Sequence, residues 1–569
     1  MGLGILEDRA MDGRVPGTTR YFDDPARPQY AVEGGRGLKT DNSGPVPIIL
    51  VPQPSDDPND PLNWPLWKRD LITFTLSMAA IFATSLGSIL AANTVTISLY
   101  MGHNFTDVAL LTGYFLLGVG VAGALFVPSS RVWGKRHTFI FGIVVLIASS
   151  VWGGVVGKQK NYTSFLWSRI IQGVGCAPFE ALVNVAVGDL YFVHQRGGRM
   201  AFTNMAVFGG AFFTPIVVGK ITDTLMWWWT FYLEAIFCAA CLPAIVFLCP
   251  ETAYRRDKRL NTDMLAGSGM VAMENGDEHP LSPEDDGHHS GEKGVSGSSS
   301  SPSADGRAAV PAKVSYLQSL APFNGRKTDE SLWKLALRPF PLFLQPAFLW
   351  ACLIQGVLIG WTVLIGVILG ASFIGSPLWW TEVQTGYAYT GPFLGAILGF
   401  IIAGGLSDWT AKVMTRWNGG VYEPEFRIVL VIPQFIFGAT GIFGWGMAAD
   451  GLLEGKFGFA VPLVFFAFEV CGMVIGAVAS SLYIVDAYRD LAIEGFTCMI
   501  IFKNLFSFAL TFKAYYWLIT NGSKATPVFN ALGAVTVVVC ATSVPMYIFG
   551  KRNRSFFHRH DILRMFGLR

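Results

Sequence analysis

Apolar runs of roughly twenty residues recur along the chain, and they constrain its fold more than any other feature. Six runs centre near residues 82, 117, 147, 176, 209 and 239, and six more near 358, 396, 438, 472, 507 and 538. Composition agrees, because 52% of the residues are hydrophobic and 14% are charged, against about 25% charged in an average soluble domain. The sequence therefore predicts an all-α membrane protein with twelve transmembrane helices in two six-helix bundles.

The predicted organisation follows from these runs and from the polar stretches between them. A polar start rich in Pro, Gly and Asp, and a low-complexity Ser/Gly-rich break between the sixth and seventh runs, are both typical of disorder. The expected segments are a disordered cytosolic tail (1–68), an N-terminal bundle (69–250), a cytosolic linker (251–340), a C-terminal bundle (341–550) and a basic cytosolic tail (551–569).

Lysine and arginine are concentrated in every second loop and after the last run, which predicts that both termini are cytosolic. Asn104, Asn161 and Asn521 each begin an N-x-S/T sequon in a loop that this topology places outside, so they are the expected glycosylation sites. A multi-pass protein of the plasma membrane is expected, with the vacuole or another internal membrane as the open alternative.

The cysteines and histidines exclude several kinds of chemistry. All eight cysteines lie within or beside apolar runs, so no disulfide framework is expected, and all eight histidines lie in loops or tails. No metal site, cofactor or nucleic-acid partner is expected. The expected partners are a small-molecule substrate, protons and the lipid bilayer, and the expected state is a monomer.

Three motifs give the chain a family resemblance. They are Arg169-Ile-Ile-Gln-Gly-Val-Gly175 in the fourth run, Gly209-Gly-Ala-Phe-Phe-Thr-Pro215 in the fifth, and Gly405-Leu-Ser-Asp408 after the eighth. In this order they resemble the major facilitator superfamily. The resemblance implies a substrate site near the midplane between two rocking bundles. It also implies fold and gating roles for Arg169, Gly173, Gly175, Pro215, Gly134, Arg136 and Asp408.

Further stretches resemble fungal drug:proton antiporters and the related transporters of organic cations such as polyamines. They are Asp57-Pro-Asn-Asp-Pro-Leu-Asn-Trp-Pro65, Asp189-Leu-Tyr-Phe-Val-His-Gln-Arg-Gly197, Pro250-Glu-Thr-Ala-Tyr-Arg255 and Tyr483-Ile-Val-Asp-Ala-Tyr488. These stretches indicate a subgroup and say nothing about the substrate.

The loop after the second run departs from the family pattern. It reads Pro128-Ser-Ser-Arg-Val-Trp-Gly-Lys-Arg136, with Arg131 where the family usually has an aspartate. The latch that the family builds on that aspartate is therefore in doubt in the N-terminal half. Gly134 and Arg136 remain available for a tight turn and for topology.

Acidic residues inside the apolar runs are the candidates for proton coupling, because a charge at the centre of a membrane helix costs about 2.5–3.5 kcal/mol. Glu180 is the first, with Asn184 one turn later on the same helix face. Glu469 is the second, and an ion pair with Lys503 is its structural alternative. Glu234 is a weaker candidate, since sixth helices of this family usually face lipid or the back of a bundle.

Three buried amides complete the predicted site. Asn93, Gln355 and Gln434 are each a candidate hydrogen-bond partner for substrate, or a hydrogen-bonding link between helices.

These features predict a transporter rather than an enzyme. The leading hypothesis is a proton-coupled exporter of drugs, toxins or a fungal secondary metabolite. The alternatives are an importer of polyamines or other organic cations, and a membrane sensor that does not transport. An ATP-driven pump is not expected, because the chain has no G-x-x-x-x-G-K-[ST] phosphate loop.

Overall fold

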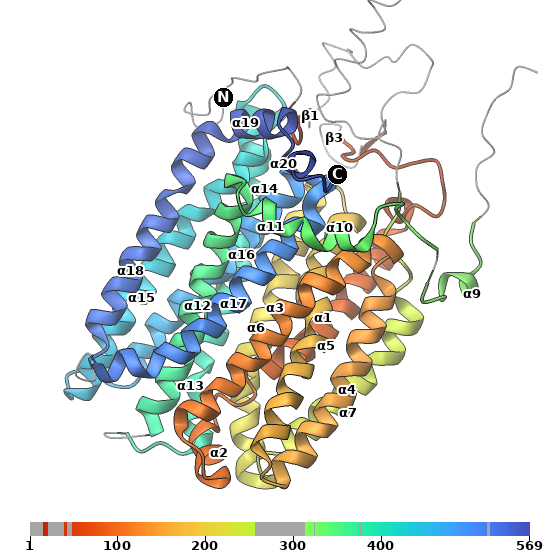
Figure 1. Cartoon of the computed structure of the whole chain (residues 1–569). Helices are drawn as coiled ribbons and strands as arrows, with labels where there is room; N and C mark the ends of the chain where they lie inside the picture. The colour runs from red at the N-terminus through yellow and green to blue at the C-terminus, as the bar shows by residue number, and fades with distance from the viewer. Residues whose placement is uncertain are drawn as a thin grey trace, which may run out of the picture.

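The computed structural model describes residues 15–20, 39–41, 48–255, 313–323, 325–374, 378–520 and 524–569 of the 569-residue chain. Within these ranges, twelve helical spans are long and apolar enough to cross a bilayer. Figure 1 shows them as a bundle of long, roughly parallel helices. The predicted all-α membrane fold is confirmed.

The first six spans lie together in Figure 1, coloured from orange to yellow-green. Their bounds are α1 (Leu66–Ser88), α3 (Phe105–Trp133), α4 (Arg136–Lys158), α5 (Tyr162–Leu190), α6 (Val193–Leu225) and α7 (Trp229–Leu248), with the short helix α2 (Thr94–Met101) after α1.

The second six spans form the green-to-blue part of Figure 1. Their long helices are α12 (Pro346–Ile374), α14 (Thr390–Trp417), α15 (Val431–Leu453), α16 (Ala460–Ala487), α17 (Ala492–Thr520) and α18 (Thr526–Ala541) with its continuation α19 (Ser543–Arg559). Short helices join or follow them: α13 (Glu382–Ala388), η3 (Pro424–Leu430), η4 (Arg489–Leu491) and α20 (Ile562–Met565).

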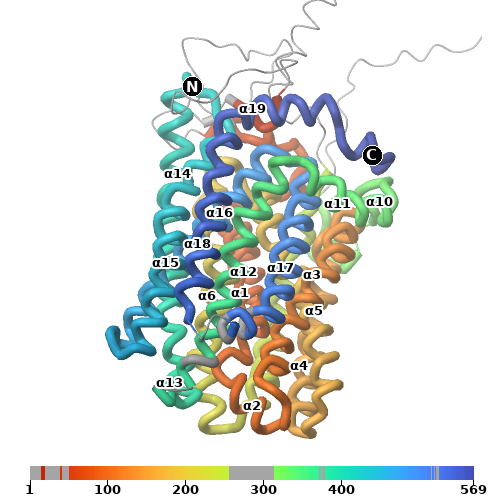
Figure 2. Tube along the Cα trace, turned by 60° about the vertical axis from the view of Figure 1, so that its left-hand side comes forward, coloured from red at the N-terminus to blue at the C-terminus, as the bar shows by residue number. Residues whose placement is uncertain are grey.

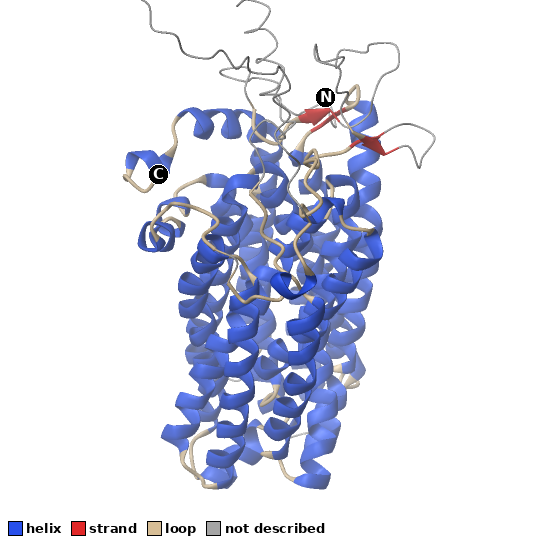
Figure 3. Ribbon diagram, turned by 90° about the vertical axis from the view of Figure 1, so that its right-hand side faces the viewer, coloured by secondary structure: helices blue, strands red, loops and turns tan. Residues whose placement is uncertain are grey.

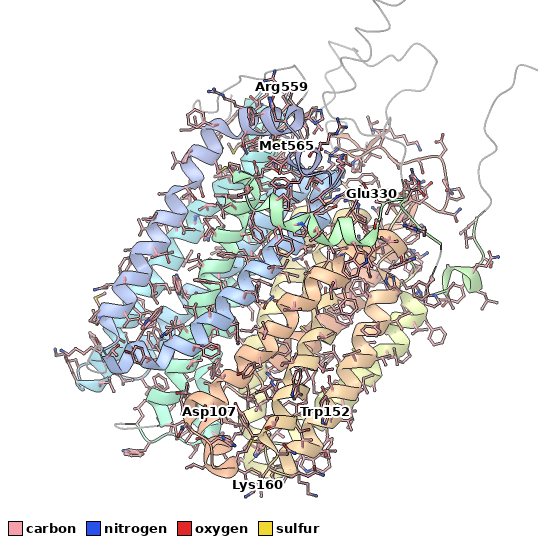
Figure 4. The ribbon with its side chains drawn as sticks, in the orientation of Figure 1. Asp107, Trp152, Lys160, Glu330, Arg559 and Met565 are labelled. Carbon is pink, nitrogen blue, oxygen red and sulfur yellow. The ribbon has the colours of Figure 1, made fainter. Side chains whose placement is uncertain are left out.

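The C-terminus lies at one end of the helices in Figure 1, and this end is called the inner end below. Figure 4 shows Glu330 and Arg559 toward this end, and Asp107 and Lys160 toward the opposite, outer end. Figure 3 shows the strands at the inner end. They form two antiparallel pairs, β1 (Thr19–Arg20) with β4 (Val421–Tyr422), and β2 (Thr40–Asp41) with β3 (Ile48–Ile49).

Part of the N-terminal tail that was expected to be disordered is ordered. The 3-10 helix η1 (Pro61–Asn63) begins at Asp60, whose carboxylate accepts hydrogen bonds from the backbone of Ser55 and Leu62. The backbone N–H of Val193 donates to the Val51 carbonyl, which holds this segment against the start of α6. A composition rich in Pro and Asp indicates disorder, but here these residues make a turn and a helix cap.

The end of the linker and the basic tail also contain regular structure and buried contacts. Residues 313–340 of the linker contain α9 (Tyr316–Ser319), α10 (Leu332–Leu337) and part of α11 (Pro339–Leu342). In the basic tail, the fully buried Arg554 pairs with Glu423 and Glu425, both at 2.7 Å. The charge of Arg554 can be buried because Glu423 and Glu425, at the start of η3, compensate it.

Glycines bring α3 and α5 into close contact. A Cβ atom on Gly173 would lie 2.1 Å from the Phe115 carbonyl oxygen, and one on Gly118 would lie 2.2 Å from the Ile170 carbonyl oxygen. Small residues allow helix backbones to approach in this way. The contact fixes the position of α5, the helix that carries Glu180.

We expect Gly173→Val to destabilise the protein by about 3 kcal/mol or more, because its side chain would overlap a backbone carbonyl that cannot rotate away. The measurement is thermal unfolding of the detergent-purified protein. The matched control is Gly405→Val, since a Cβ atom at Gly405 meets nothing within 4 Å. Equal melting temperatures for the two variants would contradict the prediction.

Candidate substrate and proton site

A cavity of about 170 Å³ lies between the two groups of helices. Its wall is apolar and aromatic with a few hydroxyls, as is typical of pockets for small organic molecules. The N-terminal half contributes lining residues from α1, α3, α5 and α6, and the C-terminal half from α12, α16 and the start of α14. They include Thr84, Ser88, Thr112, Phe115, Cys176, Glu180, Phe208, Phe212, Thr362, Tyr389, Phe466 and Met473.

Glu180 is the charged residue among the described residues that line this cavity. Its Oε1 lies 2.5 Å from Nζ of Lys503, and its Oε2 accepts a hydrogen bond from Asn504 at 3.2 Å. Both partners belong to α17, so the ion pair joins the N-terminal bundle to the C-terminal bundle. The Lys503 side chain is 4% exposed and the Glu180 side chain 13%, which leaves the carboxylate as the more accessible partner.

Asn184 does not line the cavity. Its Oδ1 accepts a hydrogen bond from Thr203 at 2.7 Å, and its amide group also contacts Asn204 of α6. The structure therefore separates Asn184 from Glu180, although both lie on α5 one turn apart.

Glu469 of α16 is fully buried behind the cavity wall. The Thr362 hydroxyl, which lines the cavity, lies 2.8 Å from both carboxylate oxygens of Glu469. The alternative ion pair with Lys503 is wrong, because Lys503 pairs with Glu180. Within the described part of the chain, Glu469 forms no ion pair and depends on a hydroxyl for its hydrogen bonding.

Glu234 of α7 faces the bundle interior rather than lipid. It is 6% exposed, and its carboxylate accepts a hydrogen bond from Ser85 of α1 at 2.9 Å. Although most of α7 is exposed, the face that carries Glu234 packs against α1. The carboxylate does not line the cavity described above.

The three candidate amides lie outside the cavity lining. Gln434 donates to the Ile354 carbonyl at 3.0 Å, which links α15 to α12. Asn93 precedes α2 and donates to the Thr222 hydroxyl of α6 at 2.6 Å. Gln355 is 5% exposed, and its Oε1 has no hydrogen-bond partner among the described residues.

Arg169 is fully buried and joins three helices. Its guanidinium donates to the Leu86 carbonyl of α1 at 2.7 Å, to the Leu111 carbonyl of α3 at 3.4 Å and to Gln172 at 2.6 Å. Gly175 continues the close packing, since a Cβ atom there would lie 2.9 Å from the Gly142 carbonyl oxygen. These contacts are structural, and none of them reaches the cavity.

The remaining motif residues lie at the ends of helices or between the bundles. Gly134 has a φ of 91°, which a side chain would strain, and a Cβ atom there would overlap Glu251. Arg136 donates to the Val246 carbonyl at 2.7 Å. Pro215 lies inside α6, where its carbonyl approaches Gly386 of α13.

Asp408 and Arg131 both make contacts between the bundles at the inner end. The Asp408 carboxylate accepts a hydrogen bond from the Gly198 backbone at 3.3 Å and lies 3.7 Å from Arg427. Arg131, which replaces the usual aspartate, contacts Glu494 of α17 at 2.5 Å. The inner end therefore carries polar links in both halves.

Two of the three predicted glycosylation sites are exposed near the outer end. Asn104 precedes α3, and Asn161 precedes α5, where its Oδ1 accepts a hydrogen bond from the Ser164 backbone at 3.0 Å. Asn521 lies outside the described residues. All three remain predictions.

The sequence suggested Lys503 only as an alternative partner of Glu469, and it did not indicate Thr362 or Asn504. A lysine in the middle of a membrane helix needs an acidic or polar partner, so the sequence does indicate that Lys503 is paired. The identity of its partner depends on which helices face α17, and no local pattern reports that.

Comparisons with known proteins agree with this architecture. The chain is 26% identical to Protein HOL1 of Saccharomyces cerevisiae over 564 residues, covering 92% of each chain. It is 28% identical to Multidrug transporter TPO1_2 of Candida glabrata over 204 residues, covering 35% of this chain and 34% of that one. The fold resembles the solved proton:xylose symporter XylE, with a TM-score of 0.53 and 15% identity over 85% of this chain and 96% of that one.

The family model of the Major Facilitator Superfamily matches residues 74–493, which spans eleven of the twelve helical spans at least in part. The chain therefore belongs to the Major Facilitator Superfamily and is a multi-pass membrane transporter.

Proposed function

We propose that this protein is a proton-coupled exporter of small organic compounds such as drugs, toxins or secondary metabolites. The observation that carries the proposal is the cavity between the bundles, with Glu180 in its wall and Glu469 directly behind Thr362. One acid is paired across the bundles and the other is unpaired among the described residues. This arrangement suits an exchange of charge between substrate and protons during transport.

The apolar and aromatic lining favours substrates with hydrophobic bodies. Phe115, Phe208, Phe212 and Phe466 face the same space as Glu180, and aromatic faces also attract cations. The Candida glabrata relative is named a multidrug transporter, which supports the same substrate class.

In the proposed mechanism, Glu469 carries the proton. An ionised carboxylate without a cationic partner is costly in an apolar interior, so the charge on Glu469 should appear only when another group compensates it. The Thr362 hydroxyl lies between Glu469 and the cavity. The charge of a substrate bound in the cavity would therefore act on Glu469 across a single hydroxyl group.

Import of organic cations, including polyamines, is the second candidate function. It is favoured by Glu180, because a carboxylate in the wall of an otherwise apolar cavity is a binding group for an ammonium. The exporter and importer hypotheses share the site and differ in direction.

The test uses yeast that lacks its own transporters of both kinds. Uptake of labelled spermidine and resistance to a panel of toxins are measured in the same strain, with and without this protein. Increased toxin resistance that disappears when the proton gradient is collapsed, without spermidine uptake, is the expected result. Spermidine uptake without resistance would replace export by cation import, and no flux of any compound would overturn both.

A further inference from the structure

The inner ends of α3 and α17 meet through charged side chains that belong to opposite bundles. Nη1 of Arg131, near the end of α3, donates to both carboxylate oxygens of Glu494 at 2.5 and 2.7 Å. The same nitrogen lies 2.7 Å from the Asp490 carbonyl oxygen, just before α17. Glu494 is 3% exposed, so this contact is well shielded from water.

Two further charged residues come from the segment that precedes α12. Arg338 pairs with Glu330 through two hydrogen bonds of 2.6 and 2.9 Å, and it also lies 3.4 Å from Glu494. Nε of Arg131 lies 3.8 Å from Glu330. Each acid therefore faces both arginines, and the four residues form a neutral cluster, called the inner quartet below.

Two chain segments are held beside the quartet, one from the linker and one from the C-terminus. The backbone N–H of Lys327 donates to the Val132 carbonyl of α3 at 2.7 Å, and Arg338 donates to the Leu568 carbonyl at 2.8 and 3.0 Å. Figure 2 shows α10 and α11 beside the inner ends of α3 and α17. The segment around α10 therefore packs against the contact between the inner ends of α3 and α17, which is called the seam below.

The two quartet members outside the membrane spans are held in their charged forms. Burial opposes ionisation of Glu330, but the hydrogen bond and the charge of Arg338 outweigh it and keep the pKa of Glu330 below its ordinary 4.5. Burial likewise opposes the charge on Arg338, but Glu330 and Glu494 outweigh it and raise the pKa of Arg338. This pair therefore stays ionised at neutral pH.

We propose that the inner quartet is the latch that closes the N-terminal half of the inner gate, and that the linker segment carrying Glu330 and Arg338 is part of that gate. The proposal rests on the proposed transport function. In this chain the charged residue on α3 is the cation Arg131, and its partner on α17 is the acid Glu494. The replacement of the usual aspartate by Arg131 therefore reverses the sign of the charge on α3 and keeps an ion pair between the bundles.

The quartet also explains how such a latch opens at low cost. When the inner ends of α3 and α17 separate, the ion pair between Arg131 and Glu494 must break. Breaking a buried pair is costly mainly because one charge is left unpaired. Here Glu494 keeps Arg338, which precedes α12 on the same side of the seam, while Arg131 moves into water.

Ile500 provides a reporter for the seam. It is 3% exposed, and its Cγ2 would lie 2.8 Å from a Cβ atom on Gly123 of α3, so the two helices cover it. Opening at the inner end uncovers this position. In the full-length protein with Ile500→Cys, reconstituted in nanodiscs, the rate of maleimide labelling at residue 500 is measured by peptide mass spectrometry.

We expect Glu494→Gln and Arg131→Gln each to raise the labelling rate roughly tenfold, because each removes the same contact between the bundles. The double variant R131Q/E494Q stays neutral and keeps Arg338 with Glu330. It should label no faster than either single variant, since interacting residues are not additive. The control is Glu454→Gln, which removes an exposed ion pair with Lys456 far from the seam.

The outcomes separate the latch from other roles. An unchanged rate in folded Glu494→Gln and in the double variant would overturn the latch. Faster labelling in Glu494→Gln but not in Arg131→Gln would show that Glu494 only anchors the linker, which also overturns it. Labelling needs no substrate, so a latch that responds in a protein that transports nothing would sink the proposed function and leave the latch standing.

Discussion

Replacing Glu180 with glutamine is expected to lower transport on the order of a hundredfold, which corresponds to about 3 kcal/mol. The substitution keeps the side chain's size and removes the charge that faces the cavity. It also leaves the ammonium of Lys503, 4% exposed, without its carboxylate. The measurement is substrate flux per molecule of protein at the membrane, with surface abundance quantified in parallel.

The reciprocal variants separate a transport role from a structural one. If the ion pair only held α5 and α17 together, the double variant E180Q/K503Q would restore flux, because neither charge would remain unpaired. We expect it to restore thermal stability and not flux. Glu454→Gln is the matched control, an acid from an exposed pair at the outer end. Wild-type flux in folded Glu180→Gln would remove Glu180 from the mechanism.

Replacing Glu469 with glutamine is expected to uncouple transport from the proton gradient rather than to abolish binding. Glutamine can still accept the hydrogen bond from Thr362, so the packing around α16 is preserved. It cannot gain or lose a proton. In proteoliposomes, uphill transport driven by an imposed pH gradient should fall roughly tenfold or more, by loss of the coupling free energy, while exchange of labelled for unlabelled substrate continues.

Thr362→Val tests the connection between Glu469 and the cavity. It removes the hydroxyl and keeps a branched side chain of similar size, so we expect weaker coupling with exchange intact. Glu234→Gln is the comparison variant, because Glu234 is a buried acid on α7 that does not line the cavity. Full proton-driven uptake by Glu469→Gln, or uncoupling by Glu234→Gln of equal size, would contradict the assignment.

The membrane fold could be predicted from the sequence because lipid imposes a simple rule. Every span must be helical and about 20 residues long, so its position is readable from apolar length alone. The ordered segments at the inner end could not be predicted from the sequence. Arg554 and Glu423 are 131 residues apart, and only the folded chain shows that they compensate each other in a buried place.

The candidate site was predictable in part, and for a similar reason. Glu180 and Glu469 stand out because a membrane helix rarely keeps an acid. Their partners depend on which helices face each other. One turn separates Glu180 from Asn184, yet the first reaches α17 and the second reaches α6. Periodicity gives the face of a helix and does not give the neighbour that covers it.

The ion pair that joins the bundles at Glu180 has a consequence for substrate selection. Under the proposed function, an ammonium group that binds Glu180 must compete with Lys503, which is covalently held beside the same carboxylate. A cation with a single charge gains little binding free energy by displacing Lys503, because it only replaces one ion pair with another. A substrate with several charges, or with an aromatic body that also fills the cavity, gains enough to do so. The lysine would then act as a threshold that rejects small inorganic and simple organic cations while admitting larger ones.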